Sequence, residues 1–296
     1  MPGRILPRKD HEPTDPWQGI GEAMAHVSRS FVVAAFWLMA GWGSIANGPS
    51  MWPRSEFALA HTPIDDPHLD DSMLVLPDLR TLPPSALEIH LGPHGRVLRL
   101  ANTVWNSGTG ALELAGEVSP ADRRVSVSQV LPRLDGSSHV KFVGEFVWHP
   151  GHNHWHINDF ALYQVWSLTP LGDLERVVAG GAKVSYCLID TDVVSPDLPG
   201  FVAGRTYRGC GRDRQGLSVG WGDTYAPYLD GQDIELADLP DGLYALVSTV
   251  NPVARLMEAN YRNNTGVVYI RLVGSRVNIL MPRDLAKEVC LSHGKC

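Results

Sequence analysis

Three histidines alternate along one stretch of the chain. Residues 146–166 read FVWHPGHNHWHINDFALYQVW and place His152, His154 and His156 at every second position. In an extended strand such residues share one face, with neighbouring imidazoles about 6.6 Å apart along the strand. A twist or bend would let all three reach one ion. Nitrogen donors without a carboxylate at the alternating positions favour copper or zinc. We therefore predict a metal site at these three residues, with the nearby His149, off the alternation, in a supporting role.

A lysine inside a predicted strand is the second candidate for chemistry. The chain has five lysines, and arginine supplies the other 20 of its 25 cationic residues. Lys183 lies in GGAKVSYCLID and shares strand parity with Cys187. If that face is buried, the pKa of the amine falls and the amine becomes a usable nucleophile. The competing interpretation is a lysine at a strand end whose charge reaches solvent.

A glycine-rich segment over residues 216–242 is the third candidate. It reads GLSVGWGDTYAPYLDGQDIELADLPDG and holds Asp223, Tyr225 and Tyr228. Taken alone, this segment predicts a turn-rich loop whose aromatic residues serve mainly in packing.

The elements that must position these residues are predominantly short strands. From residue 75 onward, runs rich in β-branched and aromatic residues alternate with turn signals such as Asp135-Gly136 and Asp241-Gly242. This spacing predicts a mainly β protein, with a single β-sandwich-like catalytic domain over residues 75–280, long loops and few short helices. The tail, residues 281–296, contains PRDLAKEVC, which predicts one short helix.

The beginning of the chain resembles an export leader. Residues 31–53 carry no charged side chain, and residues 31–48 form an apolar block between the lengths typical of a signal peptide and of a membrane anchor. We expect residues 1–48 to be a preamble with a cleaved signal peptide, the alternative being a membrane anchor, and residues 49–74 to be a linker. The domain is then secreted or extracytoplasmic.

All four cysteines follow this block. An even number of cysteines in an exported chain predicts disulfides. Three pairings exist, and we favour Cys187 with Cys210 and Cys290 with Cys296, because both close modest loops. Neither spacing is C-x-x-C, which argues against a cysteine zinc site.

Composition excludes two broad classes. With 25 basic and 32 acidic residues the net charge is −7, and no lysine or arginine run is present, which argues against a nucleic-acid partner. An apolar content of 44% with 19% charged residues is that of a globular rather than a disordered chain. The negative charge mildly favours cationic partners.

Together these stretches resemble the catalytic domain of the lysyl oxidase family, the copper amine oxidases that act on peptidyl lysine. The resemblance begins at LVLPDL (residues 74–79) and LRLANTVWNSGTGALEL (residues 98–114). It continues through the histidine stretch, KVSYCLIDTD and GLSVGWGDTY, and ends at LPDGLYALVSTVNPVARLMEANYRNNTGVVYIRL, so that it covers about 200 residues. The histidine and GDTY segments are its most specific parts.

The resemblance implies a cofactor and a reaction. It makes His152, His154 and His156 the ligands of Cu²⁺. It makes Lys183 and Tyr225 the precursors of lysine tyrosylquinone, formed after copper and O₂ oxidise the tyrosine. Primary amines, either small amines or lysine-containing proteins, would be deaminated to aldehydes with release of ammonia and H₂O₂.

Removal of the substrate's α-proton requires a carboxylate base. Asp223, two residues before Tyr225, is our candidate, and Asp159 is the alternative.

The chain also departs from the animal members of this family. Gly151 stands where they have a cysteine, so Cys210, which matches that cysteine's partner, is expected to pair with Cys187. A further histidine of the animal proteins falls near Leu162, which leaves the substrate class open. A leader without an animal-type propeptide suggests a microbial homologue.

Two other functions remain to be weighed. One is an extracellular β-sandwich binding module in which the histidines hold a structural metal. Such a module would have no use for the pair Lys183 and Tyr225. The other is a zinc hydrolase that uses Asp159 beside a three-histidine site, but the chain has no H-E-x-x-H motif to support it.

Overall fold

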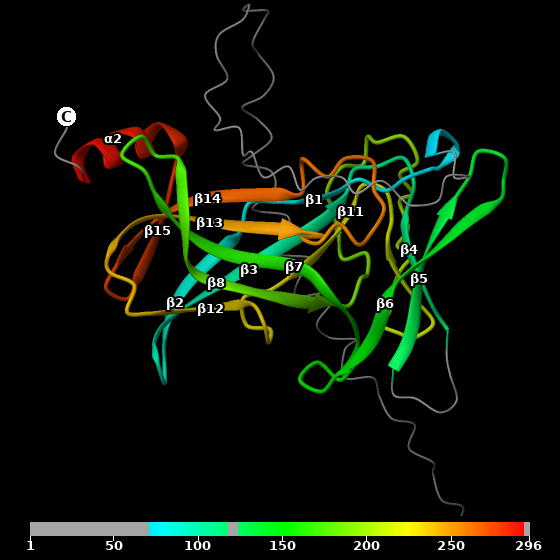
Figure 1. Cartoon of the computed structure of the whole chain (residues 1–296), viewed down its shortest axis with the longest axis horizontal. Helices are drawn as coiled ribbons and strands as arrows, with labels where there is room; N and C mark the ends of the chain where they lie inside the picture. The colour runs from blue at the N-terminus through cyan, green and yellow to red at the C-terminus, as the bar shows by residue number, and fades with distance from the viewer. Residues whose placement is uncertain (1–70, 118–123, 293–296) are drawn as a thin grey trace, which may run out of the picture. The chain divides into compact units, whose positions relative to one another are not determined.

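The computed structural model describes residues 71–117 and 124–292 (Figure 1). It is mainly β, as predicted, with two sheets. The strands of the six-stranded sheet follow the order β1-β3-β11-β9. Strand β3 also pairs with β2 and β12, so it has four neighbours. Its strands are β1 (Leu79–Thr81), β2 (Ser85–Gly92), β3 (Gly95–Asn106), β9 (Asp192–Val193), β11 (Trp221–Tyr225) and β12 (Asp233–Ala237).

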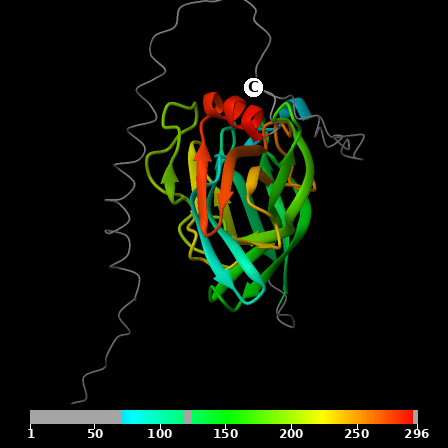
Figure 2. The same ribbon diagram turned by 90° about the vertical axis from the view of Figure 1, so that its left-hand side faces the viewer.

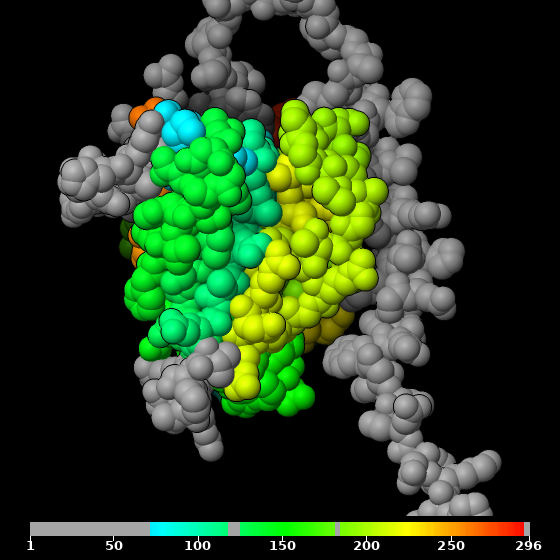
Figure 3. All heavy atoms as spheres, turned by 90° about the vertical axis from the view of Figure 1, so that its right-hand side faces the viewer, coloured from blue at the N-terminus to red at the C-terminus, as the bar shows by residue number. Residues whose placement is uncertain are grey.

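The nine-stranded sheet contains the histidine stretch. Its order is β10-β4-β5-β6-β7-β13-β14-β15, with β8 paired to β7. Its strands are β4 (Leu112–Glu117), β5 (Arg124–Pro132), β6 (Ser138–His149), β7 (His154–Leu168), β8 (Leu174–Tyr186), β10 (Arg214–Leu217), β13 (Gly242–Val250), β14 (Thr265–Val273) and β15 (Arg276–Leu280). Figure 3 shows the end of the molecule where the segment containing β10 lies beside β4 to β6.

The two sheets share one hydrophobic core, which makes the fold a sandwich. Alternation along the strands supplies it: Ala161, Tyr163 and Val165 of β7 are buried, and the residues between them are partly exposed. Residues from both sheets make up the cluster, including Leu79, Leu98, Leu100, Val104, Leu112, Val125, Phe146, Val165, Leu246 and Ile270. The alternating apolar pattern therefore predicted the fold class correctly.

Strand β7 bends just after the histidines. Through residues 154–157 it pairs with β6, and through residues 161–167 it pairs with β13, while β8 lies along its other edge. Asp159, between these two segments, has φ of 57°, an uncommon conformation for a residue with a side chain. Its carboxylate accepts a hydrogen bond from Arg255 Nη2 at 2.9 Å. The bend separates the segment of β7 that pairs with β6, which carries His154 and His156, from the segment that pairs with β13.

Helices contribute little to the described chain. A 3₁₀ turn, η1, covers Asp71–Met73, and α2 covers Pro282–Ser292, which confirms the helix expected in the tail. Figure 2 shows α2 at one end of the sandwich, where Val289 and Leu285 lie against the turn at Gly172. Within the described residues, no helix combines the length and apolarity needed to cross a membrane.

One of the two expected disulfides is present. Cys187 and Cys210 are bonded, with their Cα atoms 5.4 Å apart. The other expected pair includes Cys296, which lies outside the described residues, as do the leader at residues 31–48 and nearly all of the linker at residues 49–74.

Candidate active site

The predicted metal ligands lie on the hairpin between β6 and β7. His149 ends β6 and His154 begins β7, and the two are directly paired across the hairpin. His152 lies in the turn, so the expectation that one extended strand carries all three predicted ligands was wrong for this residue. The N–H groups of His152 and Asn153 donate to the His149 carbonyl at 3.2 and 2.8 Å. Pro150, which has no N–H to donate, and the following glycine were the turn signal in the sequence.

The turn, and not a strand twist, brings the rings together. The His156 ring centroid lies 4.9 Å from those of His152 and His154, which are 5.5 Å apart. His152 Nδ1 and His156 Nε2 approach to 3.1 Å. The cluster also contains His149, whose ring centroid is 4.4 Å from His152 and 4.6 Å from His156. We predicted only a supporting role for His149 because it is off the alternation, but the hairpin folds it back against the predicted ligands.

Unpaired nitrogens in this cluster fit a bound metal ion. The Nε2 atoms of His152 and His154 are buried and have no hydrogen-bond partner among the described residues. Buried polar atoms are usually paired, so these two nitrogens point to a missing ligand. The histidine nitrogens that lie within 4.8 Å of one another are those of His149, His152 and His156, however, and the predicted ligand His154 is not in that group. His156 Nδ1 lies 2.9 Å from Ser185 Oγ of β8, a contact that holds the ring as outer partners of metal-binding histidines do.

All three predicted ligands are uncharged at neutral pH. Burial, followed by the neighbouring histidines, lowers the pKa of His154 to about 4 and that of His156 to about 3. Burial and His149 also lower the pKa of His152, which Asp230 partly opposes. The neutral imidazole is the form that binds metals, so the cluster needs no proton release before it binds an ion. A set of nitrogen donors suits copper or zinc.

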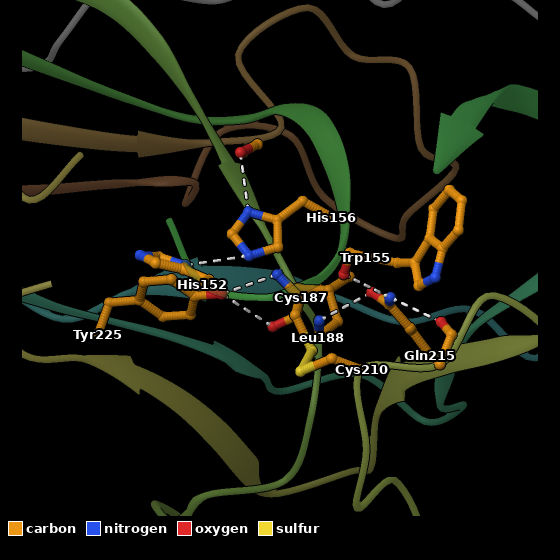
Figure 4. The surroundings of a disulfide bond; sticks show 10 residues. His152, Trp155, His156, Cys187, Leu188, Cys210, Gln215 and Tyr225 are labelled. Carbon is orange, nitrogen blue, oxygen red and sulfur yellow. Dashed lines mark hydrogen bonds between the residues drawn. A yellow bond between two sulfur atoms is a disulfide. The ribbon is translucent and has the colours of Figure 1, made fainter. Parts of the chain in front are cut away.

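Tyr225 lies next to the histidines although it belongs to the other sheet. Its ring centroid is 6.1 Å from that of His152 and 6.3 Å from that of His156. The side chain is 6% exposed, and burial raises the pKa of its phenol. The phenol oxygen accepts a hydrogen bond from the Cys187 N–H at 2.8 Å (Figure 4). The structure therefore brings together two features that are 69 residues apart in sequence, His156 and Tyr225.

Lys183 is placed by its backbone on β8, where it pairs with Leu162 of β7. The same strand carries Ser185, which contacts His156, and leads directly to Cys187, which binds the Tyr225 phenol. Strand β8 is thus the element that connects the histidine cluster to Tyr225.

The disulfide and Gln215 hold the end of β8 against the start of β7. Gln215 Nε2 donates to the Trp155 carbonyl at 2.8 Å, and Gln215 Oε1 accepts from the Leu188 N–H at 3.1 Å (Figure 4). The Trp155 N–H donates to the Cys210 carbonyl at 3.3 Å. These contacts fix the histidines relative to Tyr225 from outside the cluster.

The two carboxylates considered as bases have different surroundings. Asp223 is 1% exposed, and its Oδ2 has no hydrogen-bond partner among the described residues. Burial, with smaller effects of Asp192 and Asp190, holds its pKa well above the usual range. Asp223 in turn raises the pKa of Tyr225, so the two groups are neighbours. Asp159, in contrast, is paired with Arg255.

A buried tyrosine pair beside Tyr225 was not anticipated from the sequence. The hydroxyls of Tyr163 and Tyr186 are hydrogen-bonded to each other, Asn102 Nδ2 donates to Tyr186 at 3.1 Å, and Tyr163 donates to Gln232 Oε1 at 3.0 Å. Alternation marked both tyrosines as core residues, but their mutual contact depends on the register of β7 and β8.

The fold and the site define a β-sandwich protein with a histidine-lined candidate metal centre beside a buried tyrosine. Residues 138–281 match the family model "Lysyl oxidase". This range includes the hairpin, β8 and Tyr225, and residues 138–281 belong to the lysyl oxidase family.

Curated relatives agree with this assignment. Protein-lysine 6-oxidase of Rattus norvegicus is 35% identical over 128 residues, which cover 43% of this chain and 28% of the rat protein. Lysyl oxidase homolog 3 of Homo sapiens is 32% identical over 133 residues, 45% of this chain and 16% of the human protein. Lysyl oxidase homolog 3A of Danio rerio is 30% identical over 185 residues, 62% of this chain and 20% of that protein. The chain thus matches less than a third of the length of each of these relatives.

Proposed function

We propose that this chain is a copper- and quinone-dependent amine oxidase that converts primary amines to aldehydes and releases ammonia and H₂O₂. One observation carries the proposal: the buried ring of Tyr225 lies 6.1 Å and 6.3 Å from the rings of His152 and His156. A metal with a purely structural role does not require a buried tyrosine nearby. A copper ion that oxidises a tyrosine must lie close to it.

The metal would be Cu²⁺, held by His152, His154 and His156. The unpaired buried nitrogens of two of these residues and their uncharged state support this assignment. A lysine tyrosylquinone made from Lys183 and Tyr225 would supply the electrophilic carbonyl and accept two electrons from the amine. The position of Lys183 on β8, four residues before the Cys187 N–H that binds the Tyr225 phenol, supports the pairing.

The chain's own residues orient this tyrosine and accept the proton. The Cys187 N–H fixes the phenol oxygen, and the ring of Tyr186 covers one side of Tyr225 with centroids 4.0 Å apart. Asp223 is the proton acceptor we propose. Its buried carboxyl has a raised pKa, so its ionised form is a stronger base than an ordinary aspartate. The pairing of Asp159 with Arg255 makes it the weaker candidate.

The substrates we propose are primary amines, including lysine-containing proteins, together with O₂. The names of the relatives, protein-lysine 6-oxidase among them, support the lysine side chain as one such amine. A secreted or extracytoplasmic location, with residues 31–48 as signal peptide or membrane anchor, fits the Cys187–Cys210 disulfide, because disulfides persist in oxidising compartments.

Labelling of the aerated, copper-loaded protein with phenylhydrazine, followed by peptide mass mapping, tests the proposal. We expect one labelled, cross-linked peptide that joins the segments of Lys183 and Tyr225. Lys183→Ala and Tyr225→Phe should abolish amine oxidation while copper stays bound. Tyr228→Phe is the matched control, because Tyr228 lies three residues after Tyr225, in the loop that follows β11, and is 62% exposed.

Zinc reconstitution completes this test, since zinc cannot oxidise a tyrosine. Zinc-loaded protein should show neither the cross-link nor amine oxidation. Substantial activity in Lys183→Ala or Tyr225→Phe would contradict the proposal. Copper-loaded protein in which the two segments remain separate and unlabelled would instead favour a binding module with a structural metal.

A further inference from the structure

The turn that carries the histidines fits tightly against one carboxylate. A Cβ atom added at Gly151 would lie 2.3 Å from Asp230 Oδ2 and 3.3 Å from His149 Cε1. Real side chains do not approach other atoms at 2.3 Å, so any other residue at this position would displace Asp230 or the turn. Gly151 therefore leaves room for the Asp230 carboxylate at the edge of the histidine cluster.

This carboxylate is not neutralised by the protein. Asp230 is exposed and has no basic side chain paired with it in the part of the chain that the structure describes. It lies at the edge of the histidine cluster, because the same point at Gly151 is 2.3 Å from Asp230 Oδ2 and 3.3 Å from His149 Cε1. Other carboxylates near the site differ: Asp223 is buried and Asp159 is paired with Arg255.

The loop holding Asp230 is fixed at both ends. It follows β11 directly, five residues after Tyr225. Two residues after Asp230, the buried Gln232 accepts from the Tyr163 hydroxyl at 3.0 Å, and its carbonyl accepts from the Leu100 N–H at 3.1 Å. Within the loop, the Gln232 N–H donates to the Leu229 carbonyl at 3.2 Å. The end of the loop is therefore tied to Tyr163, whose partner Tyr186 lies against Tyr225.

We propose that Asp230 binds the ammonium group of the incoming substrate at the entrance to the site and selects amines that are cationic at neutral pH. The inference rests on the proposed function. Aliphatic primary amines are ammonium ions in neutral solution, and an exposed, unpaired carboxylate at the edge of the histidine cluster is the feature that attracts such a cation. Asp230 is a specificity residue in this scheme and takes no part in proton removal.

Steady-state kinetics with n-butylamine test the inference in the copper-loaded enzyme. Asp230→Asn should raise KM roughly twofold to fivefold, the range of an exposed ion pair, and leave kcat and bound copper unchanged. High salt should reduce the difference between the wild type and this variant. Asp230→Glu should restore part of the affinity. Asp233→Asn is the matched control, an exposed aspartate three residues further on that should change nothing.

A binding measurement without chemistry separates this inference from the proposed function. Copper-free protein should bind n-butylammonium in a titration followed by NMR, and Asp230→Asn should weaken this binding by the same factor as KM. If the wild type oxidises no amine, the proposed function fails, but this titration still decides the role of Asp230. Loss of copper in Asp230→Asn, a fall in kcat at constant KM, or no change in either experiment would each overturn the inference.

Discussion

The rings of Tyr186 and Tyr225 lie 4.0 Å apart, centroid to centroid, although the two residues end strands in different sheets. Tyr186 ends β8, and Tyr225 ends β11. The contact therefore joins the sheet that carries the histidines to the sheet that carries Tyr225. Hydrogen bonds run away from this pair, from Asn102 to Tyr186 and on through Tyr163 to Gln232. The orientation of Tyr225 thus depends on a buried polar chain.

Tyr186→Phe tests how much these buried hydrogen bonds contribute to the stability of the protein. The ring remains, but Asn102 Nδ2 loses its acceptor and the Tyr163 hydroxyl loses a partner in a site without water access. We expect the free energy of unfolding to fall by about 1–3 kcal/mol, the usual cost of unpaired buried polar groups. Urea denaturation measures the loss.

Tyr244→Phe provides the comparison, because its hydroxyl donates to the Pro240 carbonyl at 2.9 Å in a partly buried site. A smaller loss is expected there, about 1 kcal/mol or less. Equal losses in the two variants would show that breaking the buried hydrogen bonds beside Tyr225 costs no more stability than removing an ordinary tyrosine hydroxyl. The double variant Tyr163→Phe/Tyr186→Phe should lose less than the sum of its single changes, since both remove one shared contact.

The lowered pKa values of the histidines predict how the copper-free protein responds to acid. His154 and His156 have pKa values of about 4 and about 3, against 6.5 for an ordinary histidine. Below pH 6.5 the unfolded chain takes up protons that the folded chain does not. The free energy of unfolding should therefore fall as the pH drops from 6.5 toward 4, and be independent of these groups above pH 6.5.

His154→Gln should make this dependence shallower, because one titrating group is removed. Denaturant unfolding at a series of pH values measures both slopes. His139→Gln, on the far end of β6 from the hairpin, is the matched control for a histidine-to-glutamine change outside the cluster. Identical slopes in the wild type and His154→Gln would contradict the low pKa of His154.

Patterns within single segments predicted much of this protein, and relationships between segments account for what was missed. Period-two alternation gave the β-sandwich, and PRDLAKEVC gave the tail helix. The histidine run gave a cluster that the structure does form, but the turn at Pro150 placed His152 off the strand and added His149. No motif or spacing in the sequence pointed to Asp230, because the role we propose for it depends on its closeness to Gly151, 79 residues away. The stacking of Tyr186 on Tyr225 likewise depends on how two sheets meet.

The contact between Gly151 and Asp230 can be tested by stability alone. Gly151→Ala places a Cβ where the carboxylate lies, but the exposed Asp230 side chain can rotate away, so we expect a small loss of about 0.5–1 kcal/mol in the free energy of unfolding. Asp230→Ala alone should be nearly neutral, because the side chain is exposed. The double variant should recover much of the loss. Gly209→Ala, with open space around its Cβ position, is the neutral control.

Additive effects in this double-mutant cycle would contradict direct contact. Recovery in the double variant, together with a raised KM in Gly151→Ala, would show that the Asp230 carboxylate keeps its position only because residue 151 has no side chain. This cycle therefore tests whether the glycine and the aspartate depend on each other in this chain.

Ser185 should control metal affinity without being a ligand. Its Oγ lies 2.9 Å from His156 Nδ1, so it holds the ring with Nε2 directed toward His152. In Ser185→Ala the ring loses this partner, and we expect copper affinity to fall about tenfold to a hundredfold, as is usual when the outer partner of a metal-binding histidine is removed. Competition with a chelator of known affinity measures the change. Ser167→Ala, on the exposed end of β7, should bind copper as the wild type does. Unchanged affinity in Ser185→Ala would mean that packing alone orients His156, and the hydrogen bond from β8 would then have no part in building the metal centre.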